Sequence, residues 1–496
     1  MGSETVSSSG NAAPLRIMHV ASEYEGLAKS GGLADVARAL PAALAALGCE
    51  VRVLVPCYGP LRDRDFDRLI PSLSVPLNLT ERFGCSIRVW QDGPVTVYLL
   101  EHNEFFDRPG LYDDAHGPYE DNPLRFSLLT KTAFELCKAL DYRPDILHSH
   151  DWQTALAGYY RNVHYANDPF FADTRVVFNV HNGAYQGLCH ARWLGTIGID
   201  PAHFTPEQFE DHGEINLLKG GVAFSDAIVP VSPGYASELL EEKTSHGLWR
   251  QFRTHQSRLQ GILNGCDYRQ WNPETDRQIP ARYSAEDLSG KARCKASLQA
   301  SVGLAPEAQQ PLFGLVSRLT DQKGFHYLIP ALHDLLQHPV QLVLLGSGDP
   351  HFVGQLRHLA ESHPGQVQFT EGYSDTLAHR IEAGSDFFLM PSLFEPCGLN
   401  QIYSMRYGTL PIVRLTGGLK DTVVPLRADQ SNADEATGLG FTNPVIGELA
   451  ACLESAVSLY QGQPDLYAQL QQNAMAQRFT WHRAAEDYLA LYQSLS

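Results

Sequence analysis

The stretch Leu15-Arg-Ile-Met-His-Val-Ala21 is a short apolar run that predicts a buried β-strand. It is followed by the glycine-rich turn Lys29-Ser-Gly-Gly-Leu33, and then by a helical pattern from Ala34 to Leu47 that ends at Gly48. Glu50-Val-Arg-Val-Leu-Val-Pro56 is the next predicted strand. This order of strand, helix and strand is one βαβ unit, so the chain is predicted to build an α/β domain from its start.

The same alternation continues along the chain, with one interruption. In the first half, strands are predicted at Val95–Leu100, Ile146–Ser149, Arg175–Val180 and Ala227–Val231, and helices at Arg125–Leu140 and Thr154–Ala166. Turn-forming residues cluster between 260 and 280 and break the alternation. After them, strands are predicted at Leu312–Ser317, Gln341–Leu345, Val367–Phe369, Asp386–Met390 and Leu410–Val413, and helices at Phe325–Leu336, Phe352–Ser362 and Leu377–Ala383.

This pattern predicts two successive α/β domains, each a doubly wound, Rossmann-like sheet. We expect a disordered tail over residues 1–14, a first domain over 15–262, a hinge over 263–280 and a second domain over 281–478. The last segment, 479–496, has tyrosines and leucines at helical spacing from Trp481 to Leu495. It is predicted to form a helix that returns to the first domain.

Composition excludes several classes of protein. The 496 residues carry a formal net charge of −18, which argues against a general binder of nucleic acid or of anionic membranes. Nine scattered cysteines without a C-x-x-C pair favour a reducing compartment. No apolar run reaches the roughly 18 residues of a membrane helix, and the N-terminus lacks the pattern of a signal peptide. We therefore expect a cytoplasmic protein, or one of the plastid stroma or granules in a starch-making organism.

The stretch Phe394-Glu-Pro-Cys-Gly-Leu-Asn400 joins a predicted strand to a predicted helix. Glu395 would lie beside free backbone N–H groups at the start of that helix, beyond the carboxyl end of a strand, where ligands bind in doubly wound sheets. A carboxylate that only interacts favourably with the helix dipole would give the same pattern.

Two basic turns occupy equivalent positions in the two domains. The first, Lys29-Ser-Gly-Gly-Leu-Ala-Asp35, suits phosphate because glycines permit close approach and the helix start offers N–H groups, although a purely structural turn fits it as well. The second, Ser317-Arg-Leu-Thr-Asp-Gln-Lys-Gly324, places an arginine and a lysine five residues apart after a buried strand. Arg318 and Lys323 could form a clamp for a diphosphate, and a solvated basic turn is the alternative.

Four further segments lie at or just after the ends of predicted strands and carry polar or aromatic residues. His148-Ser-His-Asp-Trp-Gln153 has two histidines but no third metal ligand at conventional spacing, so it favours sugar recognition by Asp151 and Trp152 over a metal. The segment His181-Asn-Gly-Ala-Tyr-Gln-Gly187 follows the strand 176–180, and a histidine satisfied within its own loop would explain it too. Tyr373 could stack on a base or serve packing alone. Thr416-Gly-Gly-Leu-Lys-Asp421 repeats part of the first basic turn and hints that the two domains are related halves.

In combination, these motifs resemble the bacterial glycogen synthase and plant starch synthase family, from about Leu15 to the end of the chain. The motifs that carry the resemblance are Lys29-Ser-Gly-Gly-Leu-Ala-Asp35, His150-Asp-Trp152, His181-Asn182, Ile262-Leu-Asn-Gly265, Ser317-Arg-Leu-Thr320 with Gln322-Lys-Gly324, Glu395-Pro-Cys-Gly-Leu399, Arg406-Tyr-Gly-Thr409 and Thr416-Gly-Gly-Leu419. The resemblance implies a GT-B fold, in which two Rossmann-like domains face each other across a deep cleft. It further implies retaining transfer of glucose from ADP-glucose to the non-reducing end of an α-1,4-glucan or malto-oligosaccharide, without a metal or other cofactor.

The resemblance also implies a role for each matching residue. Lys29, Arg318 and Lys323, with the backbone of Gly31 and Gly32, would hold the diphosphate. Glu395 would bind hydroxyls of the donor glucose, next to the N–H groups of Cys397, Gly398 and Leu399. His181 would lie over the transferred sugar. The remaining predicted substrate contacts are Asp35, Tyr119, Asp151, Trp152, Asn182, Asn264, Tyr373 and Asn400.

Several alternatives are compatible with these motifs. The base of the donor is not fixed by these motifs, so UDP-glucose, or use of both donors, is possible. A glucan-binding scaffold without activity would be expected to have lost one of Lys29, Arg318, Lys323 or Glu395, and all four are present. Where many relatives have threonine after Gly-Leu, this chain has Asn400, so local contacts there can differ. The family is described by a front-face mechanism, in which the leaving phosphate takes the acceptor's proton, and by closure of the two domains about the hinge.

Overall fold

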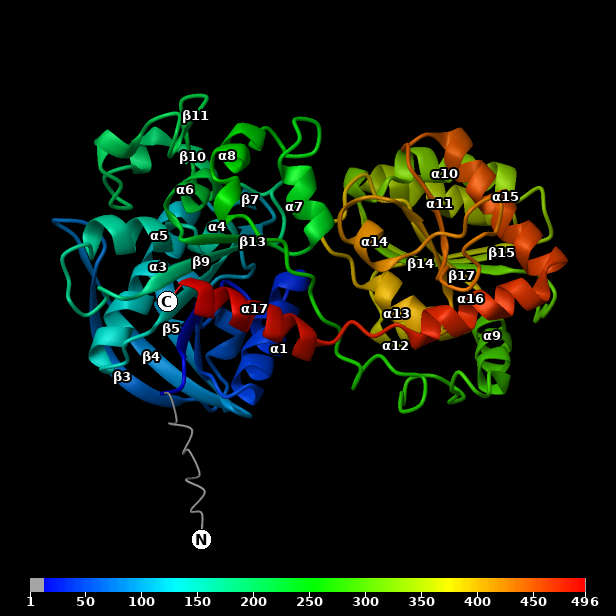
Figure 1. Ribbon diagram of the computed structural model, residues 1–496, viewed down its shortest axis with the longest axis horizontal. Coiled ribbons are helices and arrows are strands. Elements are labelled where there is room, and N and C mark those ends of the chain that lie inside the picture. Colours follow the sequence, from blue (N-terminus) through cyan, green and yellow to red (C-terminus); the bar gives the residue numbers. More distant parts are fainter. Residues whose placement is uncertain (1–12, 496) are drawn as a thin grey trace, which may run out of the picture. The chain divides into compact units, whose positions relative to one another are not determined.

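The computed structural model describes residues 13–495, and its contacts divide the chain into two compact units. Unit 1 contains the chain up to Val229, residues 245–260 and the residues from Ala484 onward. Unit 2 contains Pro230–Thr244 and Gly261–Arg483. Each unit is an α/β domain built on one large sheet (Figure 1). The predicted fold class, two Rossmann-like α/β domains, is confirmed, while the predicted tail over 1–14 lies almost wholly outside the described residues.

Unit 1 is organised around an eight-stranded sheet in the order β13-β9-β8-β1-β2-β5-β4-β3. Its strands are β1 (Arg16–Val20), β2 (Glu50–Pro56), β3 (Asp67–Pro76), β4 (Arg82–Asp92), β5 (Val95–Glu101), β8 (Ile146–His150), β9 (Arg175–Val180) and β13 (Ala227–Pro230). Parallel pairing joins β9, β8, β1, β2 and β5, whereas β4 and β3 are added antiparallel. Thus β1, the first predicted strand, lies between β8 and β2 in the parallel part of the sheet.

The β3–β4 hairpin is the part of this sheet that the sequence pattern did not predict. In β3, most side chains are exposed, a proline interrupts the strand, and the register shifts twice between Arg68 and Leu73. A strand with one poorly buried face and a shifted register does not show the regular alternation by which strands are recognised in a sequence.

The helices of unit 1 cover this sheet, and short strands form two small additional sheets (Figure 1). The helices are α1 (Gly32–Ala46), α2 (Asn103–Phe106), α3 (Asn122–Ala139), α4 (Asp151–Thr154), α5 (Leu156–Tyr159), α6 (Leu217–Phe224) and α8 (Trp249–Thr254). The minor strands are β6 (Asp113–Asp114), β7 (Gly117–Pro118), β10 (Leu188–His190), β11 (Glu210–Asp211) and β12 (Glu214–Asn216). The single helix predicted over 154–166 is divided, because a π-helical turn at Tyr160–His164 follows α5.

The C-terminal helix α17 (Trp481–Leu495) has the predicted bounds, and its residues from Ala484 onward belong to unit 1. Tyr488 and Tyr492 are fully buried there. The hydroxyl of Tyr492 lies 2.6 Å from Nδ1 of His148, and the hydroxyl of Tyr488 lies 3.0 Å from Oδ1 of Asn179. The helix therefore belongs to the core of unit 1 through polar as well as apolar contacts.

Unit 2 contains a six-stranded, fully parallel sheet in the order β16-β15-β14-β17-β18-β19. Its strands are β14 (Leu312–Leu319), β15 (Gln341–Gly348), β16 (Val367–Glu371), β17 (Phe387–Met390), β18 (Leu410–Arg414) and β19 (Leu439–Phe441). Its helices are α7 (Pro233–Leu239), α9 (Ser289–Ser301), α10 (Phe325–Leu335), α11 (Pro350–Ser362), α12 (Asp375–Gly384), α13 (Asn400–Arg406), α14 (Gly417–Thr422), α15 (Ile446–Gly462) and α16 (Pro464–Ala476). Helices α10 and α11 lie on one face of the sheet, and α9, α12 and α13 on the other (Figure 1).

Two segments fall elsewhere than the predicted domain boundaries suggest. Residues 230–244, expected within the first domain, pack in unit 2, where Ser232 Oγ donates to the carbonyl of Pro396 and the N–H of Gly234 donates to Asp421. The predicted hinge over 263–280 also belongs to unit 2. The role of this segment as a hinge remains a prediction. In the described part of the chain, no helix is both long and apolar enough to cross a membrane.

Candidate functional site

Unit 2 contains a cavity of about 180 Å³ at the carboxyl ends of the neighbouring strands β14 and β17. Part of its lining comes from two of the motifs that the sequence analysis identified in this half of the chain, 317–324 and 394–400. The predicted residues that line it are Arg318, Lys323, Glu395, Gly398, Leu399 and Asn400. Because β14 and β17 pair directly, turns that are more than 70 residues apart in the chain meet at one edge of the sheet.

Glu395 is buried in the wall of this cavity, with 7% of its surface exposed. One carboxylate oxygen, Oε2, accepts hydrogen bonds from Lys323 Nζ at 2.6 Å and from Ser392 Oγ at 2.9 Å. Hydrogen bonds from a cation and a hydroxyl hold a buried carboxylate in place. Glu395 is therefore an acceptor in a fixed position, paired with the lysine that was predicted to bind phosphate.

Arg318 and backbone N–H groups add a positive charge and hydrogen-bond donors near the Glu395 carboxylate. The side chain of Arg318 is exposed, and it makes no hydrogen bond or ion pair with any residue between 13 and 495. The N–H groups of Cys397, Gly398 and Leu399 likewise donate to no acceptor within residues 13–495. The cavity thus combines one fixed carboxylate with a guanidinium and several N–H groups that are available to a polar ligand.

Four predicted residues of unit 2 differ from these charged groups in their surroundings. The side-chain amide of Asn400 donates to the carbonyl of Val316 at 2.8 Å, so it ties α13 to β14. Cys397 is buried, and burial raises the pKa of its thiol to about 12. Tyr373 is 76% exposed, and Asn264 is buried with its Oδ1 lacking a partner among the described residues; neither lines the cavity.

The second glycine pair, Gly417-Gly418, supports the Glu395 turn and is not a second phosphate loop. A Cβ atom on Gly417 would lie 2.1 Å from the carbonyl oxygen of Glu395, and one on Gly418 would lie 2.2 Å from that of Cys397. The N–H of Gly418 donates to the carbonyl of Glu395 at 2.9 Å. Only glycine permits this approach, so the resemblance to the first basic turn lies in the residue types and not in their task.

In unit 1, the predicted residues also follow strands that are neighbours in the sheet. The turn with Lys29 follows β1, Asp151 follows β8, and His181 follows β9, and these strands lie side by side in the order β9-β8-β1. Both pairings are parallel, so the three segments leave the sheet at the same edge. This arrangement brings the unit 1 candidates together.

The turn predicted to bind phosphate is closed by a carboxylate that the sequence reasoning missed. Glu23, 3% exposed, accepts hydrogen bonds through Oε2 from the N–H of Ser30 at 2.7 Å and of Gly31 at 3.2 Å. Through Oε1 it accepts from Ser30 Oγ and from the hydroxyl of Tyr112. In this structure Glu23 therefore occupies the N–H donors of Ser30 and Gly31. A buried acidic residue just after a core strand is the signal that could have identified it.

Lys29 is likewise engaged by carboxylates of its own unit. Its Nζ lies 2.5 Å from Oδ1 of Asp35, the first acidic residue of α1, and 4.0 Å from Glu25. Burial raises the pKa of Asp35, and Lys29 opposes that shift. Lys29 and Asp35 were both predicted as site residues, and the structure shows them as an ion pair.

Asp151 has a strained backbone and a buried side chain. Its φ is +54°, a left-handed conformation that is uncommon for residues other than glycine. Its Oδ1 accepts from the N–H of His181 at 2.7 Å and from that of Asn182 at 3.4 Å. Burial, reinforced by the negative charge of Glu23, raises the pKa of Asp151 to about 7, against the effect of the two N–H groups. Asp151 thus fixes the backbone of the His181 segment.

This raised pKa predicts a measurable pH dependence of stability. The folded protein binds the proton of Asp151 more tightly than the unfolded chain does, so this group's contribution to the free energy of unfolding falls as the pH rises from about 4 to 7. The slope approaches about 1.4 kcal/mol per pH unit. In Asp151→Asn, which keeps an acceptor oxygen, urea unfolding across this range is expected to lack that slope. Parallel curves for the two proteins would contradict the assignment.

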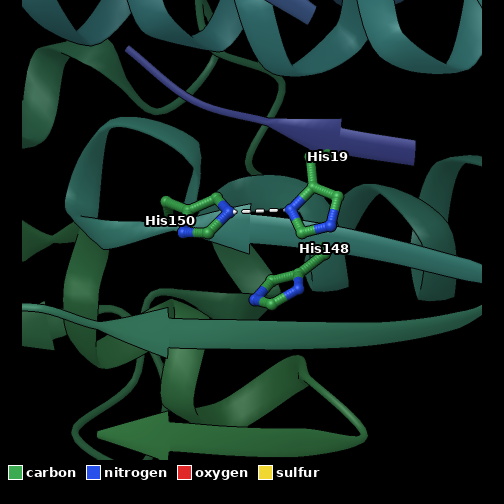
Figure 2. Close-up of side chains that lie close together, drawn as sticks. All are labelled: His19, His148 and His150. Atoms are coloured by element: carbon green, nitrogen blue, oxygen red, sulfur yellow. Dashed lines mark hydrogen bonds between the residues drawn. The ribbon is translucent and has the colours of Figure 1, made fainter. Parts of the chain in front are cut away.

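Four histidines gather next to Asp151. His19 of β1, His148 and His150 of β8, and His181 after β9 are linked by hydrogen bonds and ring contacts, and Figure 2 shows the first three. The ligand atoms of His19, His148 and His150 lie within 4.8 Å of one another, so the structure supplies the third histidine that no conventional spacing had suggested. Burial lowers the pKa of His148 and His181 to about 3, and that of His19 and His150 well below its usual value.

The remaining unit 1 candidates serve partly as packing. The ring of Trp152 lies edge-on to Phe126, and a Cβ on Gly187 would lie 2.6 Å from it, so φ of +63° and close approach both require glycine at 187. The ring of Tyr119 covers the guanidinium of Arg125, and its hydroxyl accepts from the N–H of Gly110. Asn182 Oδ1 accepts from the N–H of Ala184 within its own turn.

Comparison with known proteins supplies independent information. Residues 16–254 match the family model for the starch synthase catalytic domain, and residues 301–477 match that for glycosyl transferases group 1. The chain is 45% identical over 481 residues to a glycogen synthase of Aeromonas salmonicida (strain A449), covering 97% of this chain and 98% of that protein. It is 44% identical over 481 residues to a glycogen synthase of Aliivibrio salmonicida (strain LFI1238), covering 96% and 98%.

Two solved structures are similar. The catalytic domain of starch synthase IV from Arabidopsis thaliana, solved bound to ADP and acarbose, has a TM-score of 0.89 and 32% identity, covering 97% of this chain and 99% of that one. Sucrose-phosphate synthase from Thermosynechococcus elongatus has a TM-score of 0.59 and 17% identity, with coverage of 97% and 99%. The second likeness concerns the fold alone.

Proposed function

The chain belongs to the family of bacterial glycogen synthases and plant starch synthases, which are glycosyltransferases, and we propose that it transfers glucose from ADP-glucose to the non-reducing end of an α-1,4-glucan with retention of configuration. The observation that carries this proposal is the unit 2 cavity, in which a buried carboxylate, a guanidinium and backbone N–H groups meet at the ends of β14 and β17. The ADP bound to starch synthase IV supports an adenine nucleotide as donor.

We assign the two halves of the donor to different groups of this cavity. Arg318 and Lys323 bind the diphosphate, because a guanidinium and an ammonium match its oxygens and stabilise the charge that develops on the leaving group. Glu395 accepts hydrogen bonds from hydroxyls of the glucose. The N–H groups of Cys397, Gly398 and Leu399, which have no acceptor among the described residues, are assigned to the same sugar. In unit 1, His181 contacts the transferred sugar, and Asp151, Trp152 and Tyr119 serve the glucan.

Retention by double displacement would require a carboxylate nucleophile at the anomeric carbon. Neither Glu395 nor Asp151 is well placed to act as that nucleophile. Oε2 of Glu395 already accepts from Lys323 and Ser392, and Oδ1 of Asp151 accepts from two backbone N–H groups. This supports a front-face mechanism, in which the departing phosphate takes the proton of the acceptor hydroxyl, the new glycosidic bond forms, and the bond to phosphate breaks on the same face.

Incorporation of labelled glucose into glycogen primer tests the proposal. With ADP-glucose as donor we expect steady incorporation that is released by an enzyme specific for α-1,4 bonds, and with UDP-glucose a much lower rate. Equal rates would show dual donor use. Incorporation from neither donor, by a protein that still binds glycogen, would instead indicate a glucan-binding scaffold.

Metal independence is a separate expectation. The proposed diphosphate ligands Lys29, Arg318 and Lys323 supply the positive charge that a divalent cation supplies in other nucleotide-sugar enzymes. We therefore expect the rate with ADP-glucose to change less than about twofold after dialysis against EDTA. Strong inhibition that is reversed by magnesium or manganese would contradict this.

A further inference from the structure

A chain of hydrogen bonds connects His181 to the interior of unit 1. Nε2 of His181 lies 3.0 Å from Nδ1 of His150, and Nε2 of His150 lies 3.1 Å from Nδ1 of His19 (Figure 2 shows the second link). His150 and His19 are fully buried, whereas His181 is partly exposed. The chain therefore runs from the open end of the sheet, where His181 lies, to a closed end at His19.

The nearby His148 is not part of this chain, because its own partners fix it. Asn179 donates from its amide nitrogen to the carbonyl of Val229 at 2.9 Å, which leaves Oδ1 of Asn179 as an acceptor. His148 Nε2 contacts that oxygen and must carry the proton, so Nδ1 of His148 accepts from the hydroxyl of Tyr492. Both nitrogens of His148 are engaged.

The orientation of the rings also argues against a metal bound by the three buried histidines. The rings of His148 and His150 are stacked, with centroids 4.5 Å apart and planes 11° apart. Lone pairs of imidazole nitrogens lie in the ring plane, so nearly parallel, stacked rings do not direct them at a common point. His148 thus packs against the rings of His150 and His19, and these two hydrogen-bonded histidines continue the chain from His181.

A neutral imidazole has one N–H donor and one acceptor nitrogen, so the proton positions in the chain are coupled. If His150 donates from Nδ1 to His181, it must accept at Nε2 from His19. The reverse arrangement requires His19 to carry its proton on Nε2. That nitrogen is buried and has no partner among residues 13–495, so the reverse arrangement buries an orphan N–H. Orphan N–H groups are the rarer and costlier case.

We propose that His19 and His150 are positioning residues that hold His181 in the tautomer protonated on Nδ1, so that its ring offers a fixed N–H donor to a hydroxyl of the bound sugar. The proposal rests on the proposed function for the identity of that ligand. The tautomer itself follows from the hydrogen-bond chain alone. A ring free to exchange tautomers would spend part of its time with a lone pair where the donor is required.

The test reads the tautomer directly, in the full-length protein without substrate. Two-bond 1H–15N correlation spectra of protein labelled with 15N-histidine report which ring nitrogen carries the proton, and the signal that disappears in His181→Gln identifies His181. We expect Nδ1 of His181 to be protonated in the wild type. In His150→Leu we expect that preference to be lost, and kcat to fall by about 10- to 100-fold with a smaller change in KM. In His150→Asn, whose amide nitrogen reaches the position of Nδ1, we expect both to be largely restored.

His148→Gln is the matched control, since it disturbs the same buried rings without breaking the chain to His181. It is expected to lower the melting temperature about as much as His150→Leu does while the His181 tautomer is kept. A wild-type His181 protonated on Nε2, an unchanged tautomer in His150→Leu, or one equivalent of tightly bound metal in the purified protein would each overturn the proposal. A protein that shows the expected tautomers but transfers no glucose would refute the proposed function and leave the positioning intact.

Discussion

Replacing Glu395 by glutamine is expected to lower the rate of glucosyl transfer by about 10²- to 10³-fold, the usual effect of removing one fixed polar group that acts on the transition state. The carboxylate lies in the cavity wall, held by Lys323 and Ser392. Glutamine keeps the volume but replaces one acceptor oxygen by an N–H donor, which would face either Lys323 or the sugar. The alanine variant is expected to abolish transfer. Affinity for glycogen is expected to stay nearly unchanged, because we assign glucan binding to unit 1.

The measurement is incorporation of labelled glucose from ADP-glucose, together with glycogen binding by cosedimentation. Glu382→Gln is a suitable control. Glu382 is a buried glutamate of the same unit, and burial raises its pKa well above the usual value, so glutamine closely imitates its protonated form. Full activity in Glu382→Gln with loss in Glu395→Gln supports a specific role. Turnover by Glu395→Gln close to that of the wild type would refute the assignment of this residue.

Much of the fold could be predicted from the sequence because most strands of the two sheets are short, largely apolar and mostly buried. The predicted bounds of β2 and β9, and of the C-terminal helix, agree with those in the structure, and β1 differs by one residue at each end. Each has either an uninterrupted apolar core or clear helical spacing. The β3–β4 hairpin and the split helix at Tyr160–His164 lack such a pattern.

Candidate site residues could be predicted from the sequence where a motif follows a strand, because parallel strands bring their carboxyl ends to one edge of the sheet. Arg318, Lys323 and Glu395 illustrate this, because β14 and β17 pair directly and one cavity collects all three. Their mutual contacts were not accessible. That Lys323 pairs with Glu395, and Lys29 with Asp35, depends on distances between turns, which spacing along the chain does not encode.

The residues that the sequence reasoning missed are buried polar groups with tertiary partners. Glu23 and His19 lie on or just after β1, and their significance appears only when Ser30, Tyr112 and His150 are placed against them. A histidine in the apolar run of β1 was visible, but its partners lie on β8, more than 120 residues away in the chain. Buried polar residues in core strands are therefore worth marking as candidates even when no motif surrounds them.

Lys323→Met is expected to lower both activity and stability, whereas Arg318→Met in the same motif is expected to lower activity alone. The ammonium of Lys323 lies 2.6 Å from Glu395, whose side chain is 9% exposed, so the variant leaves a buried carboxylate without its cation. Breaking a buried pair from one side costs about 3–5 kcal/mol, and the partial exposure of Lys323 places the expected loss toward the lower end. Transfer is expected to fall by about 10²-fold or more, because the leaving diphosphate loses a ligand and Glu395 loses its orientation.

Arg318→Met and the double variant Lys323→Met/Glu395→Gln separate these two effects. The exposed guanidinium of Arg318 has no partner among the described residues, so its replacement is expected to raise KM for ADP-glucose and lower kcat without changing the free energy of unfolding. The double variant removes the unpaired charge, and urea unfolding is expected to show that it regains much of the stability lost in Lys323→Met while it stays inactive. Two results would contradict a buried, coupled contact between Lys323 and Glu395. One is a Lys323→Met variant as stable as the wild type, and the other is a double variant less stable than either single variant.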